Sequence, residues 1–373
     1  MIVYSLMSIA IVVFGFVFGN IDYGKSRKTS IISFVFILSI MVFVYASRYY
    51  VGTDFGGYLR QFNTATRQSF EQFTDSYRDI GFYGLTWVLN RIYNGNWLLY
   101  NATLAVLTYL PILVVIRNEI GEFFVYSALL YVFTMSYFSG FNGVRQAIAT
   151  GLVFYAYYMC FKNKKYVKYI LIIAVAYLFH STALFVLPFH ILSNIKVKSK
   201  IFPIVTAGLT ISYFLIWNMW EKLMTLFETM GQDKLVNDYA EIEVAEGSSF
   251  LRLLVCAMPV IVALLFYNRI KEFDGDNNDL DKDIVLSTFS TIFTLFSMKY
   301  WLFSRVGLYF ITSQILLIPK LSKIFYSVKA QKIFMFLMAI LYYAYMMALL
   351  SHGDGELVPY VFSFGKDLSR GLI

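Results

Sequence analysis

Two arginines occupy positions where a chain this apolar is expected to carry no charge. Arg145 lies in the stretch FNGVRQAIATG, near the start of a long hydrophobic run, and Arg305 lies in YWLFSRVGLYF, among aromatic residues. A guanidinium group stays charged, donates N–H groups in pairs and loses its hydration more easily than an ammonium group. These properties suit a phosphate or pyrophosphate ligand at a half-buried site. The segment from Asn142 to Gln146 predicts a polar entrance at the start of this hydrophobic run. Gly143, which has no side chain, allows a neighbouring group to approach the backbone closely there.

The composition indicates that these arginines belong to a membrane protein. Of 373 residues, 59% are hydrophobic, 19% are aromatic and only 14% are charged. The charges separate apolar runs of about 15–25 residues, the length that spans a bilayer, so we expect an all-α, polytopic integral membrane protein. The first run, residues 2–18, lacks the features of a cleaved signal peptide and should be retained. The net charge of +8 fits basic loops beside membrane spans, without nucleic-acid binding.

Lysine and arginine concentrate in short segments between the apolar runs, and such segments mark the cytoplasmic side. They predict a single transmembrane domain over residues 1–373, with about 12 crossings (range 10–13) and both termini outside. Residues 80–140 contain three candidate helices, at 80–93, 97–116 and 123–138, but this topology allows only two crossings there. The segment 80–93 is the shortest and the most polar of the three, so it should be re-entrant or interfacial. Cytoplasmic loops are expected at about 20–30, 162–168, 194–200, 268–283 and 320–332, and outer loops at about 47–79 and 218–249.

This topology brings most of the unusual polar residues to one membrane face. The expected outer-face residues are Arg48, Asp54, Arg60, Arg145, His180, Arg305, Asp354 and Glu356. Burying an ionisable group at a helix end is costly, so each is a functional candidate. His180 falls at the turn between two short crossings within residues 166–193, where we expect a recess. Asp54 could cap a helix, bind a sugar hydroxyl or pair with an arginine.

The other motifs in the sequence indicate no catalytic or metal-binding site. The acidic run from Asp274 to Asp283 lacks the glycine and the glutamate of a calcium loop, so we interpret it as a solvated loop. Cys160 and Cys256 lie in apolar runs without metal-ligand spacing. No phosphate-binding glycine loop, zinc motif or catalytic triad spacing is found, and no outer-face carboxylate pair resembles a metal site. We therefore expect neither a metal nor a cofactor.

Three stretches of the chain resemble the EpsG-like branch of the Wzy-type bacterial O-antigen and exopolysaccharide polymerases. They are SRYYVGTDFGGYLRQF, GVRQAIATGLVFYAYYMCFKNKKYVKYILIIAVAYLFHSTALFVLPFHIL and SRVGLYFITSQILLIP. By motif position, the residues that look like the functional set of this family are Arg48, Asp54, Arg145, His180 and Arg305. Topology alone adds Arg60 and Glu356. Tyr58 and Gln146 are included among the residues expected to bind substrate.

The resemblance implies a membrane glycosyltransferase of the bacterial inner (cytoplasmic) membrane whose active site faces the periplasm. It would move a growing glycan from an undecaprenyl pyrophosphate carrier to a hydroxyl of a lipid-linked repeat unit, in the biosynthesis of surface polysaccharide such as lipopolysaccharide. Its partners would be undecaprenyl pyrophosphate-linked oligosaccharides, the lipid bilayer and a chain-length regulator protein.

The chemistry of this reaction fits the residues. Cleavage of a sugar–pyrophosphate bond needs charge stabilisation on the leaving group and a base near the attacking hydroxyl. Arg145, Arg305 and Arg48 could supply the charge that a divalent metal often provides, so we expect metal independence. The candidates for the base are His180, Asp54 and Glu356.

Two other classes of function remain open. A lipid-linked oligosaccharide flippase or another transporter would also use arginines, but along a path through the membrane rather than at one face. An O-antigen ligase would use the same donor with a different acceptor, and a membrane acyltransferase is a further alternative. The gathering of arginines at one face favours an enzyme.

Overall fold

The computed structural model describes residues 1–19, 30–75, 79–229, 248–274, 279–366 and 368. Most of the predicted loops at 20–30 and 218–249, with Lys25, Arg27 and Lys28, lies outside these residues. The regular structure within the described residues is entirely helical, apart from an isolated bridge between Arg48 and Phe362. The chain packs into two compact units, of which one is Met1–Leu184 with Ile333–Ile373 and the other is Phe185–Lys332.

The helices of the first unit follow the predicted apolar runs. They are α1 (Ile2–Gly19), α2 (Ile31–Ala46), α3 (Phe55–Arg67), α4 (Phe70–Thr74), α5 (Ile80–Ile92), α6 (Trp97–Glu119), α7 (Phe124–Phe133), α8 (Ser139–Asn142), α9 (Val144–Tyr155), α10 (Tyr166–Phe179) and most of α18 (Val328–Ser351). A π-helical segment, Ala156–Phe161, continues α9. The predicted helix at 123–138 ends earlier, at Phe133, because Met135 adopts a left-handed conformation with φ of 66°.

Apolar helices of this kind are consistent with a membrane-embedded protein. Among the described residues, α6 and α18 are long and apolar enough to cross a bilayer, and several shorter helices are also apolar. The outward faces of these helices are themselves hydrophobic: Val167 and Leu171 on α10 are 76% and 61% exposed. Such surface is stable against lipid rather than water. The count of about 12 crossings stays a prediction.

Buried tyrosines and close helix contacts form the core of the first unit. Tyr109 and Tyr137 are fully buried, and their hydroxyls donate to the carbonyls of Tyr137 and Met41 at 3.1 and 2.8 Å. Such bonds offset the cost of burying each hydroxyl. Helices α6 and α9 approach closely, because a Cβ at Gly151 would lie only 2.6 Å from the carbonyl oxygen of Thr108. Small residues allow membrane helices to pack this tightly.

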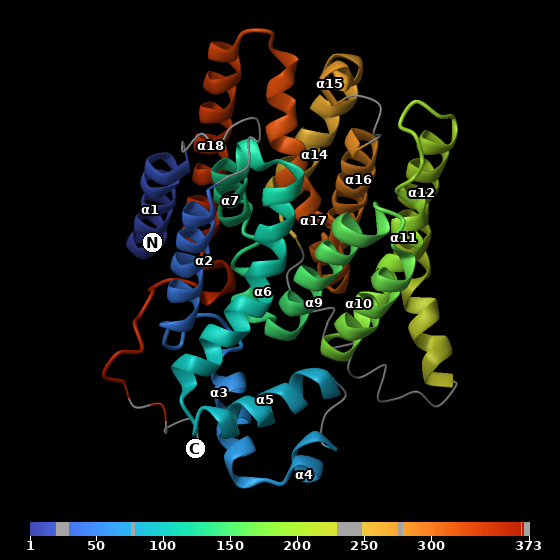
Figure 1. Cartoon of the computed structure of the whole chain (residues 1–373). Coiled ribbons are helices and arrows are strands. Elements are labelled where there is room, and N and C mark those ends of the chain that lie inside the picture. Colours follow the sequence, from blue (N-terminus) through green and yellow to red (C-terminus); the bar gives the residue numbers. More distant parts are fainter. Residues whose placement is uncertain (20–29, 76–78, 230–247, 275–278, 367, 369–373) are drawn as a thin grey trace. The chain divides into compact units, whose positions relative to one another are not determined.

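One end of the first unit carries a layer of short helices, hereafter the α5 end. Figure 1 shows α3, α4 and α5 across the end of the longer helices, with α5 running across their direction. Helix α5 has only 13 residues and packs on α3, α4 and α10. That this segment is re-entrant or interfacial in the membrane stays a prediction. Helix α3 is amphipathic and turns Phe55, Tyr58 and Phe62 inward.

The second unit is also helical. Its helices are α11 (Val186–Leu192), α12 (Ile201–Thr229), α14 (Phe250–Leu265), α15 (Tyr267–Asp274), α16 (Asp279–Ser297) and α17 (Leu302–Leu321). Here the interpretation of the acidic run as a solvated loop is wrong for its last residues. Asp281 and Asp283 are 3% and 2% exposed in the first turns of α16. They pair with Lys271 at 3.5 Å and Lys320 at 2.8 Å, so basic partners compensate their burial. Residues 275–278 of the run lie outside the described residues.

Candidate functional site

The side chain of Asn142 joins three segments that are far apart in the sequence. Its Oδ1 accepts a hydrogen bond from the backbone N–H of Thr53 at 2.9 Å, and its Nδ2 donates to the carbonyl of Gly355 at 2.9 Å. The backbone N–H of Gly52 donates to the carbonyl of Glu356 at 3.0 Å. Asn142 ends α8, two residues before α9 begins. The segments that carry Asp54, Glu356 and Arg145 are therefore held together in the first unit.

Arg145 lies in the first turn of α9, and its guanidinium is held from several directions. It forms an ion pair with Asp79, the residue before α5, and it lies 5.7 Å from the centre of the Tyr83 ring. It also hydrogen-bonds to the hydroxyl of Tyr58 on α3. The Arg145 side chain keeps 35% of its surface exposed, whereas that of Asp79 keeps 12%. The cation is thus fixed in place but still accessible. At Gly143, two residues before Arg145, an added Cβ would lie 3.6 Å from its nearest neighbour, which is an ordinary van der Waals distance.

Tyr58 connects Arg145 to Asp54. Asp54 occupies the N-cap position of α3, but its side chain makes no capping hydrogen bond, so capping is excluded from the three roles that the sequence left open for Asp54. It lies one turn before Tyr58, and its charge helps to raise the pKa of the Tyr58 hydroxyl. Burial is the main cause of that shift, which brings the pKa to about 12, although the guanidinium of Arg145 opposes it. Tyr58 is therefore an uncharged phenol at neutral pH.

His180 reaches the same end of the unit through α10. Helix α10 packs on α5 so closely that a Cβ at Gly81 would lie 2.7 Å from the Cβ of Leu178 and 2.8 Å from its carbonyl oxygen. His180 follows Leu178 by two residues at the end of α10, and Asp79 precedes Gly81 by two residues. The imidazole is half-buried, with Nδ1 2.7 Å from the hydroxyl of Thr182.

Arg48 lies deeper than the sequence suggests. It is 1% exposed, and its guanidinium carbon lies 3.7 and 4.6 Å from the ring centres of Tyr45 and Phe141. Its Nη1 donates to the carbonyl of Tyr45 at 2.7 Å, while its Nε has no hydrogen-bond partner. The backbone of Arg48 pairs with Phe362, which ties the C-terminal segment to the end of α2. Direct contact with a ligand would require these rings to separate.

The remaining predicted residues of the first unit differ in their exposure. Arg60 on α3 and Glu356 are exposed, and Glu356 adopts a left-handed conformation with φ of 53°. Gln146 is 5% exposed and faces the interior beside Arg145. Arg60 and Glu356 can therefore meet a ligand from solvent, whereas Gln146 cannot do so in this conformation.

Arg305 belongs to the second unit. It lies in the first turns of α17, is exposed, and stacks its guanidinium 4.3 Å from the centre of the Trp301 ring. The aromatic setting predicted for this cation is thus present within its own unit. Its proposed role beside Arg145 stays a prediction.

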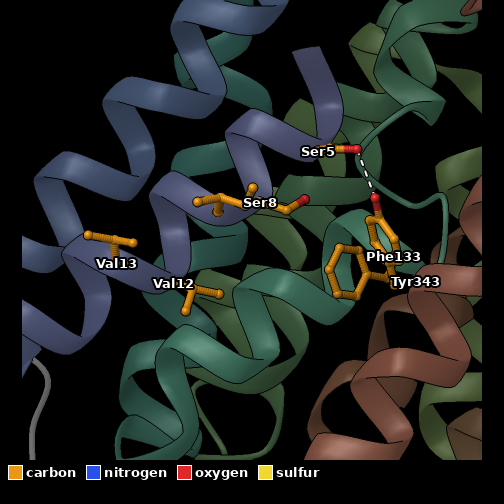
Figure 2. Close-up of a pocket in the computed structure, with 7 residues that line it drawn as sticks. Ser5, Ser8, Val12, Val13, Phe133 and Tyr343 are labelled. Carbon is orange, nitrogen blue, oxygen red and sulfur yellow. Dashed lines mark hydrogen bonds between the residues drawn. The ribbon is translucent and has the colours of Figure 1, made fainter. Parts of the chain in front are cut away.

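A pocket in the first unit lacks the groups that this chemistry needs. Figure 2 shows its lining side chains, which come from α1, α7 and α18, and its volume is about 260 Å³. They are Ser5, Ser8, Ile9, Val12, Val13, Phe133 and Tyr343. A hydrogen bond of 2.8 Å between the hydroxyls of Ser5 and Tyr343 is the main polar contact drawn there. None of these side chains is a cation or a carboxylate, so the pocket offers no group for a pyrophosphate.

Two members of the cluster, Asp79 and Tyr83, are absent from the sequence-based set. Asp79 directly precedes an apolar helix, where an aspartate usually acts as a cap, and Tyr83 is one tyrosine among thirty. The signal that could have found Asp79 is electrostatic. A cation near the N-terminus of a helix opposes the helix dipole, so Arg145 in such a position implies a nearby carboxylate. Among the described residues, no group of three or more His, Cys, Asp or Glu side chains is arranged to hold a metal.

Comparison with known proteins identifies the family. No curated protein and no solved structure matches the chain significantly. The model of the EpsG family matches residues 30–362, which include α2, the whole α5 end, the arginine of α17 and the C-terminal segment as far as Phe362. The match covers most of the chain, and the chain therefore belongs to the EpsG family, a family of Wzy-like polysaccharide polymerases.

Proposed function

We propose that the protein is a polysaccharide polymerase that transfers a growing glycan from an undecaprenyl pyrophosphate carrier to a hydroxyl of a lipid-linked repeat unit. The reaction takes place at the periplasmic face of the inner membrane, which in this proposal is the side of the α5 end. Family membership supports the reaction class. The observation that carries the assignment of the site is the accessible guanidinium of Arg145, held between Asp79 and Tyr58.

The electrostatics of this position favour an anion. Arg145 stands in the first turn of α9, where backbone N–H groups have no partner within the helix and the helix dipole is positive. A guanidinium has five N–H donors, so donors remain for a phosphate after one meets Asp79 and another meets Tyr58. Exposure of 35% lets a lipid-linked headgroup reach them. This arrangement supports the binding of the pyrophosphate that leaves the sugar.

The transfer forms one bond and breaks one. The oxygen of the acceptor hydroxyl bonds to the anomeric carbon, while the bond from that carbon to the pyrophosphate oxygen breaks. The electron pair of the broken bond leaves with the pyrophosphate, where Arg145 stabilises the added charge. The proton of the acceptor hydroxyl passes to a carboxylate or an imidazole, which acts as the general base.

Asp54 is the best supported of the candidate bases. Its carboxylate does not cap α3, and it lies close enough to Tyr58 to raise the pKa of that hydroxyl. Tyr58 in turn bonds to Arg145, so base and pyrophosphate site are linked through a single side chain. His180 and Glu356 remain alternatives, because both lie in segments that contact this cluster.

The other assignments are also part of the proposal. Arg60 would add charge to the headgroup site, and Arg48 would support that site through the rings of Tyr45 and Phe141 that enclose it. A role of Arg305 in binding the headgroup stays a prediction. Lipid-linked oligosaccharides and the bilayer are the proposed partners, with a chain-length regulator as a further one. Because arginines supply the charge, chain growth should persist in chelator.

The test is made in the host. Deletion of the gene should replace the polysaccharide ladder on a gel by single repeat units on their acceptor. Plasmid-borne wild-type protein and Asp54→Glu should restore some chain growth, whereas Asp54→Asn at the same protein level should not. Accumulation of precursor on the cytoplasmic side after deletion would instead identify a flippase. Ladders of normal length with loss of attachment to the final acceptor would identify a ligase.

A further inference from the structure

Asp79 makes the ion pair with Arg145 although its position in the chain offers it another role. It is the N-cap residue of α5, where an aspartate commonly accepts a hydrogen bond from the helix backbone. Its side chain makes no such bond. Its backbone carbonyl instead accepts the N–H groups of Phe82 and Tyr83 at 3.0 and 3.2 Å, so the helix starts without the carboxylate. The carboxylate is therefore available for Arg145.

The surroundings of the pair restrict how the guanidinium can turn. Tyr83, one turn into α5, places its ring 5.7 Å from the guanidinium carbon, and Tyr58 accepts a hydrogen bond from another side. Both tyrosines are buried, at 3% and 8% exposure, so neither can move far. Asp79 itself is mostly covered. The carboxylate and the two rings thus fix one orientation of a side chain that would otherwise sample many.

From this geometry we infer that Asp79 is a positioning residue, which orients the guanidinium of Arg145 for the pyrophosphate of the donor and lowers the net positive charge of the site. The inference rests on the proposed function of Arg145. A neutralised cation binds a departing pyrophosphate less tightly, which allows the product to leave after transfer. Asp79 touches Arg145 rather than the reacting atoms, so it acts on the rate through that arginine.

This role predicts opposite changes in rate and affinity when the carboxylate is neutralised. In Asp79→Asn, the guanidinium keeps its charge but loses its orientation, so glycan transfer by purified protein in liposomes should fall about tenfold or more. Inorganic pyrophosphate, used as an inhibitor of transfer, should bind about threefold to tenfold more tightly, because the site gains one net positive charge. Asp79→Glu keeps the charge and should recover a substantial part of the rate.

A matched control separates this role from a structural one. Asp75 directly follows α4 and is exposed, so Asp75→Asn makes the same change of charge at a solvated carboxylate rather than at the one that pairs with Arg145. It should leave both rate and inhibition unchanged. A structural role for Asp79 would lower the folded fraction and the rate together, with no tighter inhibition and no rescue by glutamate. That result, or behaviour of Asp79→Asn identical to Asp75→Asn, would overturn the inference.

The experiment also separates this inference from the proposed function. If Arg145→Lys leaves transfer and pyrophosphate inhibition unchanged, the proposed site itself is refuted, and the inference falls with it. If Arg145→Lys abolishes transfer while Asp79→Asn has no effect, the proposed site stands and only the role of Asp79 is refuted.

Discussion

The side-chain amide of Asn142 donates a hydrogen bond of 2.9 Å to the carbonyl of Gly355, 213 residues further along the chain. The same amide accepts a bond from the backbone of Thr53 through its oxygen. One residue thus fixes both the loop before α3 and the segment after α18 beside the start of α9. The position of Asp54 relative to Arg145 depends on this connection, and it leads to the first two predictions.

Removal of the Asn142 amide should loosen the site without unfolding the protein. Asn142→Ala loses two hydrogen bonds, each with a net worth of about 0.5–1.5 kcal/mol, so a total loss of about 1–3 kcal/mol is expected. Thermal unfolding of the detergent-solubilised protein should show a lower midpoint, and polysaccharide ladders should shorten. Asn142→Asp keeps the acceptor for Thr53 but sets a carboxylate oxygen against the carbonyl oxygen of Gly355, where two acceptors repel, so its midpoint should fall at least as far as that of Asn142→Ala. A wild-type midpoint for Asn142→Asp would contradict the hydrogen bond to Gly355.

Two glycines of the C-terminal segment offer a matched pair of substitutions. Gly353 and Gly355 both have left-handed backbones, with φ of 80° and 68°, so alanine strains both. A Cβ at Gly355 would also lie 2.5 Å from the Asn142 Nδ2, whereas one at Gly353 meets nothing within 4 Å. Gly355→Ala should therefore lower the unfolding midpoint more than Gly353→Ala. Combination of Gly355→Ala with Asn142→Ala should cost less than the sum of the two, and full additivity would argue against the clash.

The contact between α5 and α10 gives a third prediction. Gly81→Ala would push α5 away from the backbone of Leu178, because the added carbon has no room at 2.7–2.8 Å. This displaces Asp79 and His180 relative to one another, so both stability and chain growth should fall. Gly84→Ala on the same helix meets its nearest atom at 3.6 Å and should be neutral or slightly stabilising, since alanine favours the helix by about 0.5–1 kcal/mol. Equal unfolding midpoints and equal ladders for the two variants would show that the close contact is unimportant.

The raised pKa of Tyr58 gives a pH-dependent prediction. Burial holds the hydroxyl neutral up to about pH 12 in the folded protein, whereas it ionises near 10 when unfolded. The folded state binds more protons in this window, so the stability due to Tyr58 is complete below pH 10 and is lost as the pH rises toward 12. Relative to that of Tyr58→Phe, the unfolding midpoint of the wild type should fall as the pH rises from 9 to 11.5. A constant difference would mean that the hydroxyl is not buried as described.

Much of the helical organisation could be predicted from the sequence, because the apolar runs set helix length and position. The first apolar run was expected at 2–18 and forms α1 over Ile2–Gly19, and the short polar segment at 80–93 forms the separate helix α5. Hydrophobic length fixes such elements locally. Hydrophobicity gave no sign of the division into two units, which falls at Leu184 inside an apolar stretch, because that division depends on which helices pack together.

The candidate site was predictable only in part. Charge in an apolar context singled out Arg145, and the structure places it at an accessible helix start. The partner Asp79 could not be recognised by type, since an aspartate before a helix is common. Arg48 was expected to help Arg145 to bind the pyrophosphate, yet aromatic residues from α2 and α8 enclose it. Burial of a cation among rings depends on contacts between segments that are distant in the sequence, which a single sequence does not reveal.

The most direct test of the proposed mechanism compares two arginine-to-lysine substitutions for glycan chain growth in the host, at matched protein levels. Arg145→Lys keeps the charge but loses the paired donors, while Arg67→Lys makes the same change at an exposed position in the last turn of α3. We predict that Arg67→Lys gives ladders of wild-type length and that Arg145→Lys gives single repeat units or none. Wild-type ladders from Arg145→Lys would contradict the binding of the leaving pyrophosphate by this guanidinium.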